Sequence, residues 1–296
     1  MKISISAGDF PETYNLDKAL KVIKDLNVNY VEVIYGKDIL YKDNITSFKN
    51  ILSSKNLKIS SVDNWCVFTK KEMIEQNQNT LIDSINTAKE MNVNIVRIGP
   101  FGGVENGILT KEVLKEYKNG ILPCLKEAEK NKVYLVLENE FYDDPCQSAL
   151  QTLEILKYMD SEYFRLLYDP CNYYIAGEEP FPYTYDIVKK YIKYIHIKDA
   201  MKIKEWEKAE VSERGRKEAN CYLDKAGNTI WKHKKNDYLC LALGEGGCNY
   251  DGLLKQLKKD KYEGFLSIEP HVREEIHTET LKKNITYMQE RGGKIL

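Results

Sequence analysis

Short apolar runs of strand length alternate with amphipathic helical stretches along nearly the whole 296-residue chain. Residues 3–5 form the first run, and the helix after it begins at a capping Asn15, with apolar positions at Leu16, Ala19, Leu20, Ile23 and Leu26. Further strand-like runs cover residues 30–35, 58–62, 94–98, 133–138, 164–169, 194–198 and 264–269. The expected helices after them cover residues 44–55, 72–91, 111–131, 147–159, 184–193, 250–259 and 278–291.

Eight such strand–helix units predict an α/β fold, the closed (β/α)₈ TIM barrel, as a single domain over residues 1–296. Helices that join parallel strands make right-handed crossovers, and eight of these units close a barrel. An open, doubly wound parallel sheet is the alternative that the same pattern allows. Within the helix expected over residues 111–131, Gly120 and Pro123 predict a kink or a split.

One segment interrupts the alternation. Residues 200–243 separate the seventh strand from its helix, far more than the usual loop of about two to six residues. Within this insertion, residues 222–231 predict a hairpin that turns at Gly227 and Asn228. Because it follows a strand, the insertion should lie at the C-terminal face of the barrel, where active sites of this fold lie. It would serve there as a lid, an oligomer contact or a solvated surface.

The charge balance argues against large anionic partners. Lys and Arg number 44 and Asp and Glu 45, so no overall basic field exists to hold nucleic acid or an anionic membrane. No run approaches the roughly 18 apolar residues of a membrane span, and the N-terminus lacks the apolar core of a signal peptide. The seven cysteines are scattered without CxxC spacing, which predicts reduced thiols in a cytoplasmic protein.

Four ionisable residues each end a mostly apolar run, at the fifth to eighth expected strands: Glu138, Asp169, His196 and Glu269. Residues two apart in a strand share a face, so all four side chains should point inward and converge at the barrel mouth. Three packed carboxylates repel one another unless a cation lies between them. Three carboxylates and one imidazole suit a hard or borderline divalent ion. We expect Mn²⁺ first, with Mg²⁺ and Co²⁺ as alternatives and Zn²⁺ less favoured.

Five segments carry motifs in a characteristic order: Val136-Leu-Glu-Asn-Glu140, Tyr168-Asp-Pro-Cys-Asn172, His196-Ile-Lys-Asp199, Leu243-Gly-Glu-Gly246 and Gly264-Phe-Leu-Ser-Ile-Glu-Pro270. In these motifs the chain resembles the sugar phosphate isomerase/epimerase family, the xylose isomerase-like TIM barrels. That family includes ketose 3-epimerases, hydroxypyruvate isomerases, inosose dehydratases and endonuclease IV. The resemblance covers essentially the full length, and it implies that Glu138, Asp169, His196 and Glu269 hold one divalent metal.

The resemblance further implies an isomerase or epimerase acting on a small sugar, sugar phosphate or related keto-polyol. In such enzymes the two glutamate ligands, here Glu138 and Glu269, face each other across the substrate. The metal stabilises an enediolate, while one carboxylate removes a proton and the other returns it. A lyase of the inosose dehydratase type would begin with the same step. An endonuclease IV-like enzyme and a non-catalytic sugar-binding barrel are weaker alternatives. A small carbohydrate is the expected partner, and homo-oligomer formation stays open.

Six further residues are candidate substrate contacts: Asn172, Lys198, Trp65, Glu245, His271 and Asp144. Asn172 stands where the resembled epimerases have a histidine, so a three-zinc cluster is not expected, but its amide can bond a substrate hydroxyl. Asp144 takes the place of the epimerases' second acidic residue, six positions after the first glutamate ligand.

Several of these candidates have structural alternatives. Lys198 shares the inward face with His196, yet a salt bridge with Asp199 or Glu245 is an equal expectation. Glu245 would otherwise brace its loop, and His271 would lie at the surface.

Three positions near the strand ends have alternatives of their own. Trp65 would wall the pocket or pack in the core. Glu140 would replace Glu138 as a ligand if the fifth strand runs longer. Arg97 alternates with Ile98 in the fourth strand, which predicts an outward position for Arg97.

Overall fold

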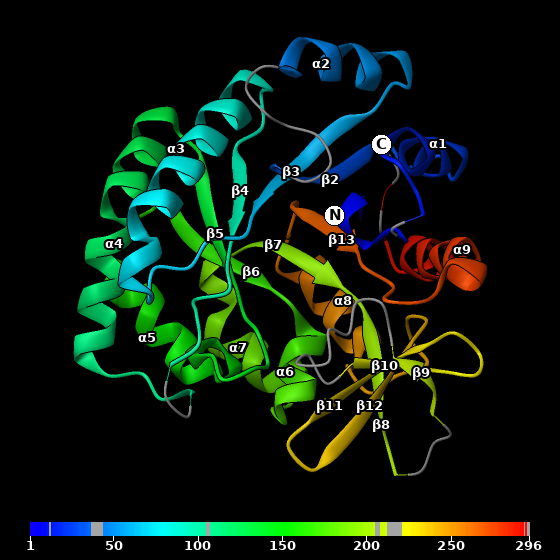
Figure 1. The fold of residues 1–296 in the computed structure, drawn as a ribbon. Coiled ribbons are helices and arrows are strands. Elements are labelled where there is room, and N and C mark those ends of the chain that lie inside the picture. Colours follow the sequence, from blue (N-terminus) through cyan, green and yellow to red (C-terminus); the bar gives the residue numbers. More distant parts are fainter. Residues whose placement is uncertain are drawn as a thin grey trace.

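Eight parallel strands close into a barrel in the computed structural model (Figure 1). Neighbours around the barrel follow the order β1-β13-β7-β6-β5-β4-β3-β2. These strands are β1 (Lys2–Ser6), β2 (Tyr30–Ile34), β3 (Lys58–Asn64), β4 (Ile95–Ile98), β5 (Tyr134–Glu138), β6 (Phe164–Tyr168), β7 (Ile192–Ile197) and β13 (Phe265–Ile268). The structure describes the chain except residues 12, 37–43, 105–106, 205–207, 212–220, 293 and 295–296. Because β1 pairs with both β2 and β13, the predicted barrel is confirmed and an open sheet is excluded.

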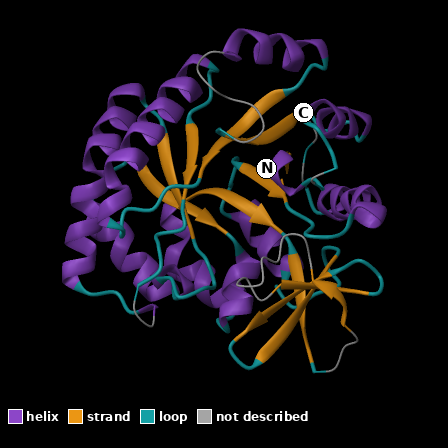
Figure 2. Ribbon diagram, viewed as in Figure 1, coloured by secondary structure: helices purple, strands orange, loops and turns teal. Residues whose placement is uncertain are grey.

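Helices surround the barrel (Figure 2). They are α1 (Leu16–Asp25), α2 (Ile45–Ser54), α3 (Ile74–Glu90), α4 (Lys111–Asn131), α5 (Ala149–Met159), α6 (Pro170–Ala176), α7 (Tyr185–Val188), α8 (Tyr250–Lys259) and α9 (Glu274–Glu290). Short 3₁₀ turns cover Ala7–Asp9, Lys71–Met73, Pro145–Gln147 and Lys189–Tyr191, and a π turn covers Pro180–Thr184. Asn15 caps α1 as predicted, because its side-chain oxygen accepts a hydrogen bond from the Lys18 backbone N–H (2.9 Å).

Helix α4 is more regular than expected. It runs uninterrupted over Lys111–Asn131, so Pro123 does not split it. Gly120 marks a close approach instead, because a Cβ at this position would lie 3.3 Å from the Cβ of Phe68. The Gly120 carbonyl also accepts a hydrogen bond from the Gln78 side chain (2.6 Å). The glycine therefore allows α4 to pack closely on its neighbours.

The segment between β6 and β7 also differs from expectation. Helix α6 follows β6 directly and was not predicted; Asp169 caps it by accepting a hydrogen bond from the Asn172 N–H (3.0 Å). The segment expected to be one helix over 184–193 is instead a turn over Pro180–Thr184, in which Phe181 is extended (φ −138°, ψ 127°), followed by the short helix α7. Strand β7 already begins at Ile192.

The barrel interior has an apolar layer next to a polar one. Ile95, Val136, Leu167 and Tyr194 pack together inside the barrel, each at most 3% exposed. The next inward positions on the same strands, two residues later, are Arg97, Glu138, Asp169 and His196. The apolar layer therefore forms the floor of the polar end.

The insertion after β7 is a five-stranded antiparallel sheet beside the barrel (Figure 1). Its strands are β8 (Asp199–Ile203), β9 (Lys208–Val211), β10 (Cys221–Asp224), β11 (Thr229–His233) and β12 (Asn236–Leu241). Strands β10 and β11 form the predicted hairpin, with Gly227 (φ 91°) in its turn. The Arg273 N–H donates to the Gly227 carbonyl (2.8 Å), which ties this turn to the segment after β13. The predicted insertion includes residues 205–207 and 212–220, which lie outside the described residues.

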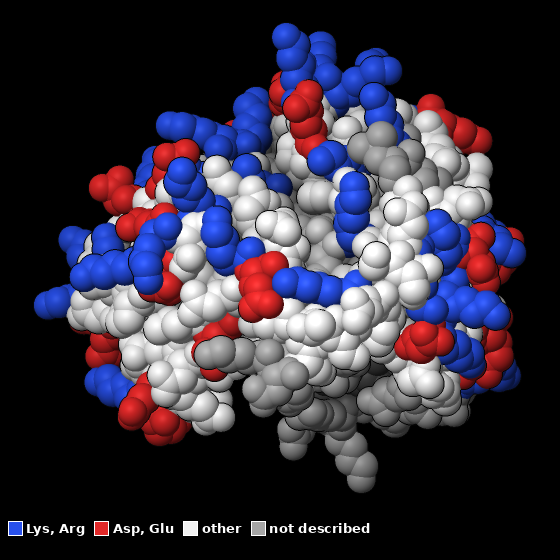
Figure 3. Space-filling model, turned by 90° about the horizontal axis from the view of Figure 1, so that it is seen from above, with Lys and Arg blue, Asp and Glu red and all other residues white. Residues whose placement is uncertain are grey.

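The face shown in Figure 3 carries charged side chains of both signs, with Lys and Arg more prominent than Asp and Glu. Among the described helices, none is both long and apolar enough to pass through a membrane.

Replacing Leu167 with alanine should lower the free energy of unfolding by about 2–5 kcal/mol, because it opens a cavity in the floor of the barrel. Urea denaturation measures the change. Leu150→Ala is the matched control, since that side chain on α5 is 58% exposed and its loss should change stability by less than about 0.5 kcal/mol. Equal effects of the two substitutions would contradict the packing described here.

Candidate metal centre

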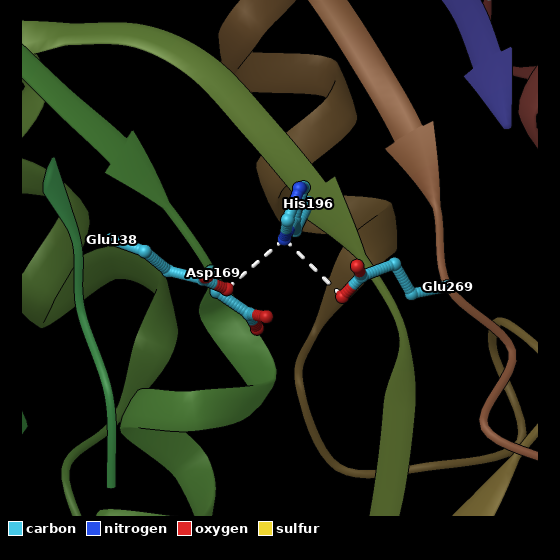
Figure 4. Close-up of side chains that lie close together, drawn as sticks. All are labelled: Glu138, Asp169, His196 and Glu269. Carbon is cyan, nitrogen blue, oxygen red and sulfur yellow. Dashed lines mark hydrogen bonds and ion pairs between the residues drawn. The ribbon is translucent and has the colours of Figure 1, made fainter. Parts of the chain in front are cut away.

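Four neighbouring strands bring four ionisable side chains together at one end of the barrel (Figure 4). Glu138 is the last residue of β5, and His196 lies one residue before the end of β7. Asp169 and Glu269 directly follow β6 and β13. One ligand-type atom from each residue lies within 4.8 Å of the other three. The four residues that the sequence predicts to converge therefore do so.

The His196 imidazole lies between two carboxylates. Its Nδ1 is 3.0 Å from Glu138 Oε1 and 3.2 Å from Glu269 Oε2. Figure 4 shows these two glutamates approaching the ring from opposite sides. Nδ1 is therefore the imidazole atom that faces the centre of the group.

Glu32, on β2, binds the other side of the same imidazole and was not predicted. Its Oε1 and Oε2 lie 3.0 Å and 3.1 Å from His196 Nε2. When the ring is neutral, a carboxylate at Nε2 favours the Nε2–H tautomer, which leaves the Nδ1 lone pair for a cation. The signal in the sequence is a single acidic residue in the apolar run Val31-Glu-Val33.

Burial and neighbouring charges set the protonation of this group. Burial raises the pKa of Asp169, although the charge of Lys198 opposes it. Burial alone would lower the pKa of His196, but the charges of Glu269, Glu32 and Glu138 outweigh it and raise that pKa. Both shifts favour the protonated forms of Asp169 and His196 in the metal-free protein, and a divalent cation would displace these protons on binding.

Lys198 points into the group rather than toward the loop. Its Nζ lies 2.7 Å from Asp169 Oδ2 and 3.6 Å from Glu269 Oε2. Asp199, its alternative predicted partner, instead accepts hydrogen bonds from the backbone N–H groups of the segment 244–248. Lys198 therefore supplies positive charge at the barrel mouth.

Arg97 also points inward, which corrects the outward position expected for it. It is 4% exposed, and its Nε donates to Glu138 Oε2 (2.6 Å). Val96 and Ile98 pack on the helices instead, as part of the outer apolar core. A strand of a parallel barrel is covered on both faces, so apolar residues occur on both and do not reveal which face is inward.

A cavity of about 660 Å³ opens above the four residues. Glu138 and Glu269 line it, and so do four of the predicted substrate contacts: Trp65, Asn172, Lys198 and His271. Glu140 lines it as well, but the group of converging ligand atoms contains Glu138 and not Glu140.

Asp144 and Glu245 are not brought to this cavity. The Asp144 carboxylate accepts hydrogen bonds from the backbone N–H groups of Gly102 (2.9 Å) and Cys146 (2.7 Å). Burial raises its pKa to about 6. Glu245 is exposed on the loop before α8. Asp144 thus braces two loops, and Glu245 faces solvent.

Trp231, from the insertion, lines the cavity and was not predicted. The centroid of its ring lies 5.4 Å from the ring centroid of Phe141, which follows β5. It lies 5.9 Å from the ring centroid of His271, which follows β13. It therefore bridges the loops that follow the two glutamates. The insertion reaches the barrel mouth, as its position after a strand predicts.

The residues present fit a divalent cation. Three carboxylates and one imidazole nitrogen form an oxygen-rich donor set, and the oriented Nδ1 faces it. The first glutamate offers Oε1 to the centre while Arg97 holds Oε2. The described structure thus contains a buried group able to bind a divalent metal.

Comparisons with known proteins point to one family and fold. A sequence profile of the xylose isomerase-like TIM barrel family matches residues 20–291. A probable 3-DHS dehydratase, AsbF from Bacillus anthracis, has a similar structure (TM-score 0.73, 16% identity, 98% of this chain and 99% of that one). A xylose isomerase-like TIM barrel protein from Mycobacterium smegmatis in complex with magnesium is also similar (TM-score 0.70, 17% identity, 98% of this chain and 95% of that one). A third similar structure is the D-psicose 3-epimerase of Clostridium cellulolyticum H10 with D-tagatose (TM-score 0.69, 10% identity, 99% of this chain and 100% of that one). No curated protein sequence matches the chain.

Glu32→Gln should weaken Mn²⁺ binding about tenfold, because it removes the charge that orients His196. Titration calorimetry on metal-free protein measures the dissociation constant. Glu162→Gln, an exposed position before β6, is the control and should bind Mn²⁺ as the unaltered protein does. If both variants bind equally well, Glu32 does not act on the site.

Mn²⁺ affinity should rise with pH, because Asp169 and His196, whose pKa values are both raised, bind a cation only after losing their protons. Calorimetry in buffers of different ionisation enthalpy should show proton release on binding. An affinity that stays constant from about pH 6 to 8 would contradict this prediction.

Proposed function

The chain belongs to the xylose isomerase-like TIM barrel family, and we propose that it is a divalent-metal-dependent isomerase or epimerase of a small sugar, sugar phosphate or related keto-polyol. One observation carries the proposal. Glu138 and Glu269 both line the cavity from opposite sides of His196, while Asp169 and His196 are fully buried. Two carboxylates therefore reach the substrate space, and the other two ligands lie behind them.

The chemistry follows from these positions. A bound divalent cation, for which Mn²⁺ is our first expectation, would polarise a ketose carbonyl and make the neighbouring C–H more acidic. Glu269, the most exposed of the four side chains at 14%, then takes that proton to give an enediolate. Lys198 Nζ, 3.6 Å from Glu269 Oε2, helps to balance the negative charge that develops.

The cavity walls suit a small polyhydroxylated molecule. Trp65, Phe141, Tyr142 and Trp231 provide aromatic faces, against which the C–H faces of a sugar pack. Asn172 Oδ1 is buried without a hydrogen-bond partner, so it is available to a substrate hydroxyl. Both features favour a carbohydrate over a purely apolar ligand.

A dehydratase is the second candidate. The same proton abstraction by Glu269 would be followed by loss of a β-hydroxyl group as water. Lys198, beside Glu269 and Asp169, is placed to assist the departing hydroxyl. Nucleic-acid cleavage is disfavoured by the net charge of −1 and by Asn172, because an amide is a poor zinc ligand.

Exchange of solvent deuterium tests the proposal directly. Ketoses, ketose phosphates and inososes would be incubated in D₂O with protein loaded with Mn²⁺, Mg²⁺, Co²⁺ or Zn²⁺, and NMR would follow deuterium uptake. Exchange that EDTA abolishes and Mn²⁺ restores is the expected result. A protein that binds a sugar without exchange would instead be a non-catalytic barrel.

Glu269→Gln should lower the exchange rate by about 10²–10⁴-fold, because it removes the carboxylate that takes the proton. Metal content and circular dichroism should be measured in parallel, so that loss of the ion or of the fold is recognised. Glu162→Gln is again the control and should retain full activity. Normal exchange by Glu269→Gln would reject this role of Glu269.

A further inference from the structure

The Arg97 guanidinium is held in place on several sides. Its Nη1 lies 3.3 Å from Asp63 Oδ2, and its central carbon lies 4.5 Å from the centroid of the Trp65 ring. Its Nη2 is 3.8 Å from Glu140 Oε1. A guanidinium packed in this way presents its remaining N–H groups in one fixed direction.

That direction leads to a single oxygen of Glu138. Both Nε, at 2.6 Å, and Nη2 of Arg97 donate to Glu138 Oε2. The other oxygen, Oε1, faces His196 Nδ1 (3.0 Å) and Asn172 Nδ2 (3.5 Å). The two oxygens of Glu138 therefore have different partners: Oε1 faces the candidate metal position, and Oε2 binds Arg97.

Glu269 is held differently. Within the described part of the chain, the ion pairs of its carboxylate all involve Oε2, with His196 (3.2 Å), Lys198 (3.6 Å) and His271 (3.8 Å). Its side chain is 14% exposed, against 1% for Glu138. The two cavity carboxylates are thus unequal, because both oxygens of Glu138 are held by Arg97 and His196, whereas among the described residues only Oε2 of Glu269 makes ion pairs.

We propose that Arg97 is a positioning residue that fixes Glu138 as a metal ligand and excludes it from proton transfer, so that Glu269 alone moves the substrate proton. This inference rests on the proposed function. To accept a proton on Oε2, Glu138 would have to give up its buried ion pair with Arg97, which would then keep only Asp63 and the more distant Glu140 as charge partners. Glu269 can accept a proton on Oε1 while its Oε2 keeps the ion pairs with His196, Lys198 and His271.

With a single carboxylate to transfer the proton, only some products can form. Glu269 takes the proton from the carbon next to the carbonyl and returns it, on the same face, to the former carbonyl carbon. The proton of the neighbouring hydroxyl passes to the former carbonyl oxygen, so atoms and charge balance. The product is the 1,2-isomer, an aldose from a ketose. Inversion at C3 needs a proton donor on the opposite face, which the clamped Glu138 does not provide.

Metal binding tests the interaction between Arg97 and Glu138 without any substrate. Mn²⁺ dissociation constants would be measured by calorimetry for the unaltered protein, Arg97→Gln, Glu138→Gln and the double variant. Arg97→Gln should weaken binding about tenfold when Glu138 is present, but by less than about twofold when Glu138 is already Gln. Equal weakening in both backgrounds would show that Arg97 does not act through Glu138 and would overturn the proposal.

Two further variants secure this comparison. Arg165→Gln is the matched control, since Arg165 on β6 donates to the backbone carbonyls of Ser161 and Phe164. It should leave Mn²⁺ affinity unchanged. If Arg97→Gln fails to fold, Arg97→Lys replaces it, because lysine keeps the charge but lacks the two-pronged donor geometry.

The product decides the second half of the proposal. Mn²⁺-loaded protein would be incubated with D-tagatose and with D-fructose in D₂O. Formation of the aldose, without the C3 epimer, is the expected result, whereas the C3 epimer would overturn the proposal. An elimination product would support the single carboxylate but replace isomerisation by dehydration. Absence of exchange with both sugars would count against the proposed function, and the Mn²⁺ cycle would then decide on Arg97 by itself.

Discussion

Negative charge buried at one end of the barrel is the constraint on which the rest of this structure depends. Carboxyl groups reach this end from five strands or strand ends, those of Glu32, Asp63, Glu138, Asp169 and Glu269, and Glu140, just after β5, adds another. Buried charges are tolerated only when they are paired and hydrogen-bonded. Arg97, His196 and Lys198 supply part of the compensation, and a divalent cation would supply more. The apolar floor and the closed strand pairing hold these groups in register.

The fold was largely predictable because its long elements bury one face at a regular spacing. The apolar positions after Asn15 and the eight strand-like runs correspond to α1 and to the barrel strands. Gly227 marked the β10–β11 turn for a similar local reason, since it has a positive φ. The helical turns over 170–191 were harder to predict, because helices of four to seven residues are too short to show the periodic spacing of apolar residues.

The residues of the site likewise fall into those that the sequence predicts and those that it does not. The four residues of the candidate metal centre could be found from sequence because each ends a mostly apolar run. Glu32 and Arg97 lie within strands that are apolar on both faces, so their inward direction became clear only from the register of the closed sheet. Trp231 reaches the cavity from a long insertion, and no local pattern predicts where such a segment folds back.

The insertion sheet shares no strand with the barrel, yet Trp231 from its strand β11 lines one side of the cavity. Part of the cavity wall is therefore encoded in a different stretch of the gene from the acid–base groups beside it. Changes confined to β11 would therefore alter the cavity wall without replacing any of the four ligand residues. Such modularity gives a chain of this kind a simple evolutionary route to new ligands.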